Sequence, residues 1–269
     1  MNRARLISGL WLGLLLAQFA LVSLRVCLPH PLLGDAGWPE GLLLLLAVGG
    51  TLAGQARQAP GQNVALASII ILSLAGLALA VGARAGIPFG PITGPGRSGN
   101  QLLGWLPWAA ALWLLVLLTS RGVARLILRP CRASSTCGFQ VIGLTVLLVV
   151  LFHLAFQPFA SCLEHSWPWQ GGSPPADWRG TPCVGLAAQA VAALVILIFA
   201  TPSLIEKKPA SLPPDSSPLI AWVLANLLFT TAAITRHLWL AAALASSSAL
   251  LVTLLGLRGA AHAREAKWS

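Results

Sequence analysis

Eight long apolar runs, separated by short polar loops, dominate the hydrophobicity pattern of the chain. They cover residues 6–27, 39–54, 64–86, 102–120, 138–160, 182–204, 218–235 and 237–257. An α-helix needs about 20 apolar residues to cross a hydrocarbon core of about 30 Å. The pattern therefore predicts an all-α, polytopic transmembrane helix bundle of about eight spans. Because the run at 39–54 is short and contains Gly49, Gly50 and Gly54, seven spans is the alternative.

The composition of the chain agrees with a membrane location. Hydrophobic residues make up 57% of the sequence and charged residues 9%, with a mean hydropathy of +0.80. Soluble domains usually contain about 25% charged residues. We therefore interpret residues 1–269 as a single integral membrane domain, and we expect it in the cytoplasmic (inner) membrane of a bacterium.

The distribution of basic residues predicts the orientation of the bundle. Lys and Arg collect on cytoplasmic loops. With both termini in the cytoplasm, twelve basic residues fall on that side and five on the other. In this orientation residues 206–217 form a proline-rich cytoplasmic linker, residues 161–181 form a Trp- and Pro-rich outer loop, and residues 258–269 form a polar tail.

The net charge of +10 does not indicate nucleic-acid binding, because the basic residues flank apolar runs instead of sharing one soluble face. Anionic lipid headgroups are the partners that such residues favour. Arg121, Arg125, Arg129 and Arg132 recur at helical spacing after the fourth run. We expect a helix extension at the inner surface, with buried side-chain stems and guanidinium groups at the headgroups.

The few polar residues within the runs are the candidates for function, because ionisable groups are costly inside a bilayer. His153 lies deepest, and Gln157 and Glu164 follow at a spacing that places them on one face if the helix continues. Such a stripe would face a cavity in the bundle. For His153 alone, a hydrogen bond between helices is the favoured interpretation. Arg84, at the end of the third run, is expected to reach the outer headgroups.

The cysteines suggest one candidate cross-link and no metal site. Cys162 and Cys183 flank the Trp-rich loop on the predicted outer side, where a disulfide would persist. Two free thiols are the alternative. Cys131 and Cys137 lack the spacing and the histidine partners of a zinc site.

Two groups of motifs carry a resemblance to a known family. The first is Gly86-Ile-Pro-Phe-Gly90, followed by Leu106-Pro107 and Trp113; the second is Gln157-Pro-Phe-Ala160, Trp167-Pro-Trp169, Trp178 and Gly180-Thr-Pro182. In this order they resemble the carotenoid biosynthesis membrane proteins that include the carotenoid hydratases, over roughly residues 75–235. The chain departs from the family pattern at Pro91 and Thr93, which replace tyrosines, and at Gln157, which replaces an acidic residue.

The resemblance implies addition of water to a terminal isoprenoid double bond of an acyclic carotenoid. This chemistry needs a positioned acid, a bound water and aromatic faces that stabilise a tertiary cation, but no metal or redox cofactor. Glu164 is the expected acid, with His153 and Gln157 holding water. The expected substrate-binding residues are Arg84, Phe89, Gly90, Trp113, Pro158, Trp167 and Trp169. The alternative is a non-catalytic subunit that binds a carotenoid or lipid within a larger membrane complex.

Overall fold

The computed structural model describes residues 3–28, 38–86, 89, 99–131, 136–160, 177–178, 181–205 and 215–265. Within these residues, each of the eight predicted runs forms one long α-helix. The helices are α1 (Arg3–Cys27), α2 (Trp38–Gln58), α3 (Gly61–Ala85), α4 (Gly99–Ile127), α5 (Cys137–Pro158), α6 (Cys183–Ala200), α7 (Ser217–Thr235) and α8 (Trp239–Glu265). Two short 3₁₀ helices, η2 (Arg129–Cys131) and η4 (Thr201–Leu204), follow α4 and α6.

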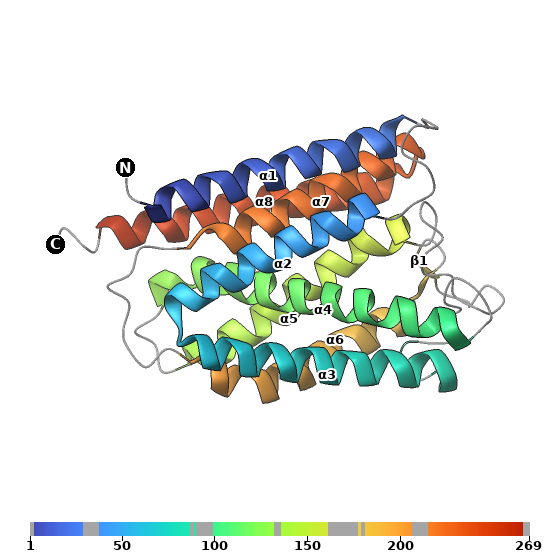
Figure 1. Ribbon diagram of the computed structural model, residues 1–269, viewed down its shortest axis with the longest axis horizontal. Coiled ribbons are helices and arrows are strands. Elements are labelled where there is room, and N and C mark those ends of the chain that lie inside the picture. Colours follow the sequence, from blue (N-terminus) through green and yellow to red (C-terminus); the bar gives the residue numbers. More distant parts are fainter. Residues whose placement is uncertain are drawn as a thin grey trace.

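The helices run side by side in one elongated bundle (Figure 1). In that view α1, α7 and α8 form one side, α3 and α6 form the other, and α4 and α5 lie between them. The central helix is α4, which packs against α2, α3, α5, α7 and α8. Its most apolar stretch is 72% buried, whereas that of α1 is 17% buried. The bundle therefore has an interior that is shielded from lipid by its outer helices.

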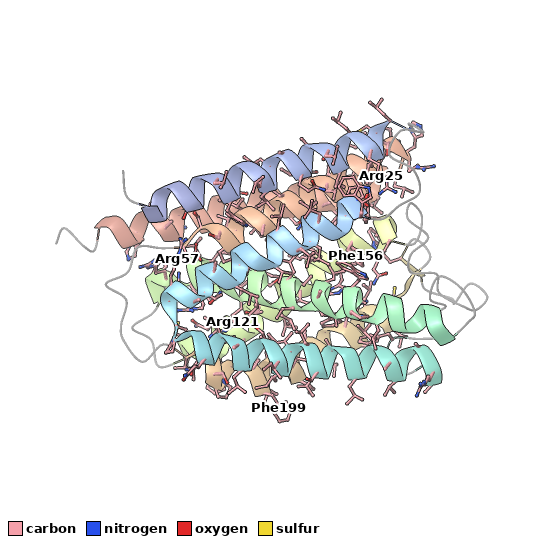
Figure 2. All side chains as sticks on the ribbon, in the orientation of Figure 1. Arg25, Arg57, Arg121, Phe156 and Phe199 are labelled. Atoms are coloured by element: carbon pink, nitrogen blue, oxygen red, sulfur yellow. The ribbon has the colours of Figure 1, made fainter. Side chains whose placement is uncertain are left out.

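Seven of the helices are long and apolar enough to span a membrane, and α2 is the exception. It has 21 residues and packs along α1 and α4, but its glycines and terminal polar residues dilute its apolar run. This result confirms the predicted membrane helix bundle with seven or eight spans. Large apolar side chains cover the outside of the bundle, including Leu77, Phe199 and Leu250. Figure 2 shows Phe199 pointing away from the other helices, as expected for a side chain in contact with lipid.

The helix boundaries follow the predicted runs, except at one end of the bundle. Helix α4 continues seven residues beyond the run that ends at residue 120, and α8 continues eight residues beyond residue 257. These extensions contain Arg121, Arg125 and Arg258. Helix α1 begins and α8 ends at the same end of the bundle (Figure 1). We call it the basic end; its assignment to the cytoplasm remains a prediction from the charges.

Arg121 at the basic end differs from its predicted role at the lipid headgroups. Its side chain is only 5% exposed, and Nη2 donates a hydrogen bond of 2.9 Å to the carbonyl oxygen of Leu204 in η4. The last carbonyls of a helix lack partners within the helix, and a cation there is also favoured by the helix dipole. Arg121 therefore connects α4 to the end of α6 inside the protein.

Two close approaches bring further helices against this region. A Cβ atom on Gly122 would lie 2.6 Å from the ring of Pro218, the second residue of α7. A Cβ atom on Gly259 of α8 would overlap the backbone carbonyl of Leu126 in α4. Small residues allow membrane helices to pack this closely. We refer to Arg121, Gly122, Leu204 and Pro218 as the basic-end junction.

Candidate functional site: an aromatic core around His153

His153 is buried in the second half of α5 and has a defined proton arrangement. Its Nδ1 atom lies 2.8 Å from the carbonyl oxygen of Val149, one turn earlier in the helix. A carbonyl oxygen can only accept a hydrogen bond, so Nδ1 carries the proton. In the neutral imidazole this leaves Nε2 as an acceptor. Gln157 follows one turn later, fully buried on the same helix. His153 thus combines a structural bond with a ring nitrogen that is able to accept a proton.

One face of the His153 ring packs near Trp113 of α4, with ring centroids 5.1 Å apart. Trp113 in turn lies 5.9 Å from Phe89. Phe89 is brought back to the bundle because α3 ends at Gly86, whose φ of 70° is the left-handed conformation that glycine adopts readily. Three of the predicted site residues, Phe89, Trp113 and His153, therefore form one continuous row of rings.

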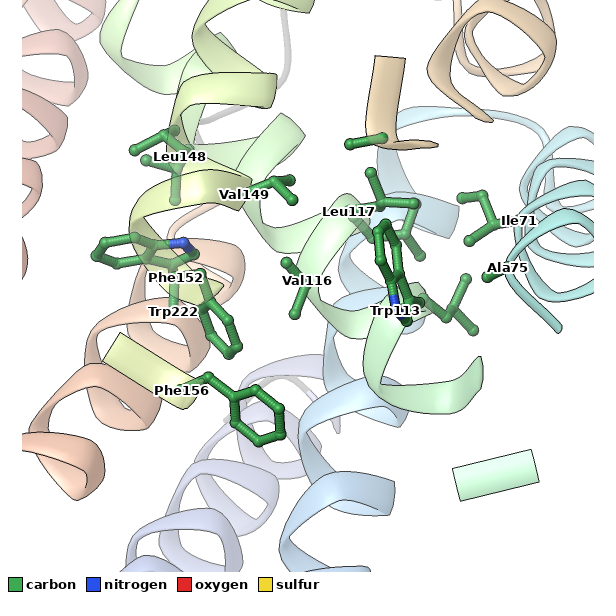
Figure 3. Packing of buried hydrophobic residues seen from close by; sticks show 14 of the residues in the cluster. Ile71, Ala75, Trp113, Val116, Leu117, Leu148, Val149, Phe152, Phe156 and Trp222 are labelled. Atoms are coloured by element: carbon green, nitrogen blue, oxygen red, sulfur yellow. The ribbon is translucent and has the colours of Figure 1, made fainter. Parts of the chain in front are cut away.

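The neighbouring side chains of α5 extend this row toward α7. The ring of Phe152 meets that of Phe229 edge-on, with centroids 5.3 Å apart, and its centroid lies 6.3 Å from that of Trp222. The ring centroids of Phe156 and Phe229 are 5.6 Å apart. Figure 3 shows Phe152, Phe156 and Trp222 together on one side of Val116 and Trp113 on the other. We call the whole set the aromatic core; it comprises Phe89, Trp113, Phe152, His153, Phe156, Phe159, Trp222 and Phe229.

Pro158 and Trp178 define the end of α5 beyond the aromatic core. As expected for a proline, Pro158 is the last residue of the helix, and a short π-helical turn follows at Phe159 and Ala160. The indole nitrogen of Trp178 donates a bond of 2.8 Å to the carbonyl oxygen of Leu154. Trp178 belongs to the two-residue strand β1 (Asp177–Trp178), which pairs antiparallel with β2 (Thr181–Pro182). The chain that leaves α5 thus returns to the same helix.

Several predicted residues lie elsewhere. Arg84 is exposed in the last turn of α3, away from the ring contacts described above. Cys183 is an exposed thiol at the start of α6. The remaining predictions, on Glu164, Gly90, Trp167, Trp169 and Cys162, lie outside the described residues, so the disulfide and the acid remain predictions. Among the described residues, no three His, Cys, Asp or Glu side chains gather around a common point.

The residues that α7 contributes were not among the predicted site residues. Trp222, Asn226 and Phe229 have spacings of four and three residues, which place them on one helix face. Asn226 is the one amide within the apolar run at 218–235, and that was the available signal. The aromatic residues carried no such signal, since tryptophan and phenylalanine are common in any membrane helix.

The fold and the aromatic core define a class of protein: a polytopic helical membrane protein with a buried, ring-lined interior. The sequence model of the carotenoid biosynthesis protein family matches residues 40–254. That match covers most of the 269 residues, so the chain belongs to this family. The matched segment contains the aromatic core and helices α3 to α7 in full. No curated protein and no solved structure matches the chain.

Proposed function

We propose that this protein adds water to a terminal double bond of an acyclic carotenoid within the bacterial cytoplasmic membrane. Membership of the carotenoid biosynthesis family supports a role in that pathway. The observation that carries the proposed chemistry is the position of Trp113, which contacts both His153 and Phe89 in the buried interior. A polyene is apolar along its length, so an aromatic interior suits its end.

The reaction begins when an acid protonates the less substituted carbon of the double bond, which leaves a tertiary cation on the neighbouring carbon. Aromatic faces attract a cation, and indole does so most strongly. Trp113 and Phe89 supply such faces in this proposal. We assign the acid to Glu164, which follows Pro158, the last residue of α5, by six residues. Six residues of chain span at most about 22 Å, which limits how far Glu164 can lie from this helix end.

Water then attacks the cation and loses a proton, which forms the tertiary alcohol. His153 is suited to accept that proton, because its Nδ1–H is engaged by Val149 and Nε2 is the acceptor. Gln157, one turn away, is suited to orient the water through its amide. The proton lost from water balances the proton that the acid donates, so the net change is the addition of one water molecule.

Glu164→Gln tests this assignment. The protein is produced in a bacterial host that accumulates an acyclic carotenoid, and the pigments are separated by chromatography and identified by mass. Wild type is expected to give an alcohol heavier by one water. Removal of a general acid typically lowers the rate by about 10²–10⁴-fold, so the variant should give almost none. Glu164→Asp is the matched control, with partial product; full conversion by Glu164→Gln would show that Glu164 is not the acid.

A non-catalytic role in carotenoid binding is the second candidate. The observation that favours it is Gln157, an amide at a position where the family pattern has an acid. In this case wild type protein would be purified with the unmodified carotenoid, and the pigments of the host would not change. Absence of the alcohol in the wild-type pigment extract therefore separates the two candidates.

A further inference from the structure

Helix α7 contains two buried polar atoms without hydrogen-bond partners, one of them on Trp222 of the aromatic core and the other one turn further along the helix. These atoms are Nε1 of Trp222 and Oδ1 of Asn226, and neither has a partner in the described part of the protein. Both residues are fully buried. Buried polar atoms almost always have a partner, and one that lacks it within the protein indicates a bound water or ligand. The pair is therefore a candidate binding site that is distinct from His153 and Gln157.

The orientation of the Asn226 amide follows from its neighbour. Nδ2 donates a bond of 2.9 Å to the carbonyl oxygen of Trp222. Because a carbonyl accepts and does not donate, the nitrogen must face it and the oxygen must face away. Asn226 therefore presents an acceptor, while the indole of Trp222 presents a donor. One group is a hydrogen-bond donor and the other an acceptor, yet they do not bond to each other.

The contacts of Phe152 show which way this face of α7 points. Phe152 of α5 contacts Trp222 at 6.3 Å and Phe229 at 5.3 Å. Asn226 lies between these two residues on the same face, since the spacing is four and then three residues. Asn226 therefore lies on the buried side of α7, next to the face that contacts Phe152, the neighbour of His153 in α5. The orphaned donor and acceptor thus lie inside the bundle, beside the aromatic core residues of α7, and not against lipid.

The polarity of the two atoms selects the chemistry of the ligand. A group that satisfies both must accept a hydrogen bond from the indole N–H and donate one to the amide oxygen. A carbonyl has no proton to donate, and an ammonium group has no lone pair to accept. A hydroxyl group does both. The rings beside this face of α7 are apolar, so water or one alcohol on an apolar chain suits the site.

We propose that Trp222 and Asn226 bind a single hydroxyl group, as a water molecule or as the tertiary alcohol of a hydroxylated isoprenoid. This inference deepens the proposed function, and the assignment of this water to hydration rests on it. The site would store the water that is added and recognise the alcohol that forms. The hydroxyl site itself depends only on the two orphaned atoms, and so it is testable without turnover.

The test is nuclear magnetic resonance of the full chain, labelled with ¹⁵N in the tryptophan indoles and held in detergent micelles. The Trp222 indole resonance is assigned by its absence in Trp222→Phe. Three samples are compared: protein alone, protein with a hydroxylated acyclic carotenoid, and protein with the parent hydrocarbon. In the sample without ligand, we expect the Trp222 indole N–H resonance at a downfield, hydrogen-bonded position, with a cross-peak to water. The alcohol should replace that cross-peak, and the hydrocarbon should leave it.

Two variants sharpen the result. Asn226→Leu removes the acceptor and should shift the Trp222 resonance and weaken binding of the alcohol by about two- to tenfold, the effect of one hydrogen bond. Its matched control is Thr231→Val, which removes a hydroxyl on the exposed side of the same helix and should change neither. If Trp222→Phe does not fold, the spectra of the alcohol and hydrocarbon samples are compared directly. An indole resonance that differs between the two samples in wild type, but not in Asn226→Leu, then supports the site.

An indole resonance at the position of a free N–H in all three samples, unchanged by Asn226→Leu, would overturn the inference. The hydroxyl site and the hydration activity are separable in the same experiment. In His153→Asn the resonance should keep its hydrogen-bonded position although hydration is lost. If the wild-type protein hydrates the carotenoid but its Trp222 indole N–H is not hydrogen-bonded, only the hydroxyl site is contradicted. If the Trp222 indole N–H is hydrogen-bonded but no hydration occurs, only the proposed function is contradicted.

Discussion

The basic-end junction and the aromatic core both bury polar side chains in an apolar bundle, yet they use them differently. At the junction Arg121 donates to the carbonyl of Leu204, a group that the end of a helix leaves without a partner. In the aromatic core, Trp222 and Asn226 keep a donor and an acceptor that no described residue satisfies. Burial alone therefore does not identify a functional site in a membrane bundle; the kind of buried group and what it can bind have to be considered with it.

The same contrast exists within His153 itself. Its Nδ1 atom is held by Val149, which is a structural bond within α5, and its Nε2 atom is the one available for chemistry. The ring then lies against Trp113 and within reach of Phe152 and Phe156. One residue thus contains both kinds of polar group, and substitutions can separate them.

His153→Asn has the largest expected effect. The Asn amide is able to keep a hydrogen bond to the Val149 carbonyl, but its carbonyl oxygen is not a base and cannot take the proton that Nε2 accepts. We expect hydration to fall by about 10²–10⁴-fold, as for loss of a general base, with thermal stability close to that of wild type. Pigment analysis, normalised to folded protein, measures the activity. Unchanged hydration in a folded His153→Asn protein would place the chemistry elsewhere.

Arg121→Leu should have a smaller effect, and on stability. It leaves the Leu204 carbonyl without its donor, and hydrogen bonds to charged groups contribute about 1.5–3 kcal/mol. Unfolding in mixed micelles should therefore be easier by about 2 kcal/mol, while turnover per folded molecule stays unchanged. The matched control is Arg258→Leu, an exposed arginine at the same end, which should alter stability by less than about 0.5 kcal/mol. A loss of turnover in folded Arg121→Leu would remove the distinction between the two regions.

The sequence predicted the helices well because the bilayer imposes one simple requirement. Each span must satisfy its own backbone and expose apolar side chains, so a run of about 20 apolar residues is sufficient to identify it. Helices α4 and α8 were underestimated in length, since their last turns contain arginines and extend beyond the apolar runs. Hydrophobicity marks the part of a helix that lies in lipid, and not the whole helix.

The candidate site was predicted only in part, because a single sequence does not specify which helices are neighbours. His153 was visible as an ionisable residue at depth, and the family motifs pointed to Phe89 and Trp113. Trp222 and Phe229 come from a helix more than 60 residues further along the chain, and only packing of α5 against α7 brings them together. For the same reason the helical spacing of the arginines did not reveal that Arg121 faces protein.

The central claim is that this membrane bundle transfers the elements of water to a carotenoid. It is tested most directly with purified protein, an acyclic carotenoid in mixed micelles, and water enriched in ¹⁸O. We expect a tertiary alcohol whose single new oxygen carries the heavy isotope, formed without added oxidant. Recovery of the carotenoid unchanged, or of an alcohol whose oxygen is not drawn from the labelled water, would contradict it.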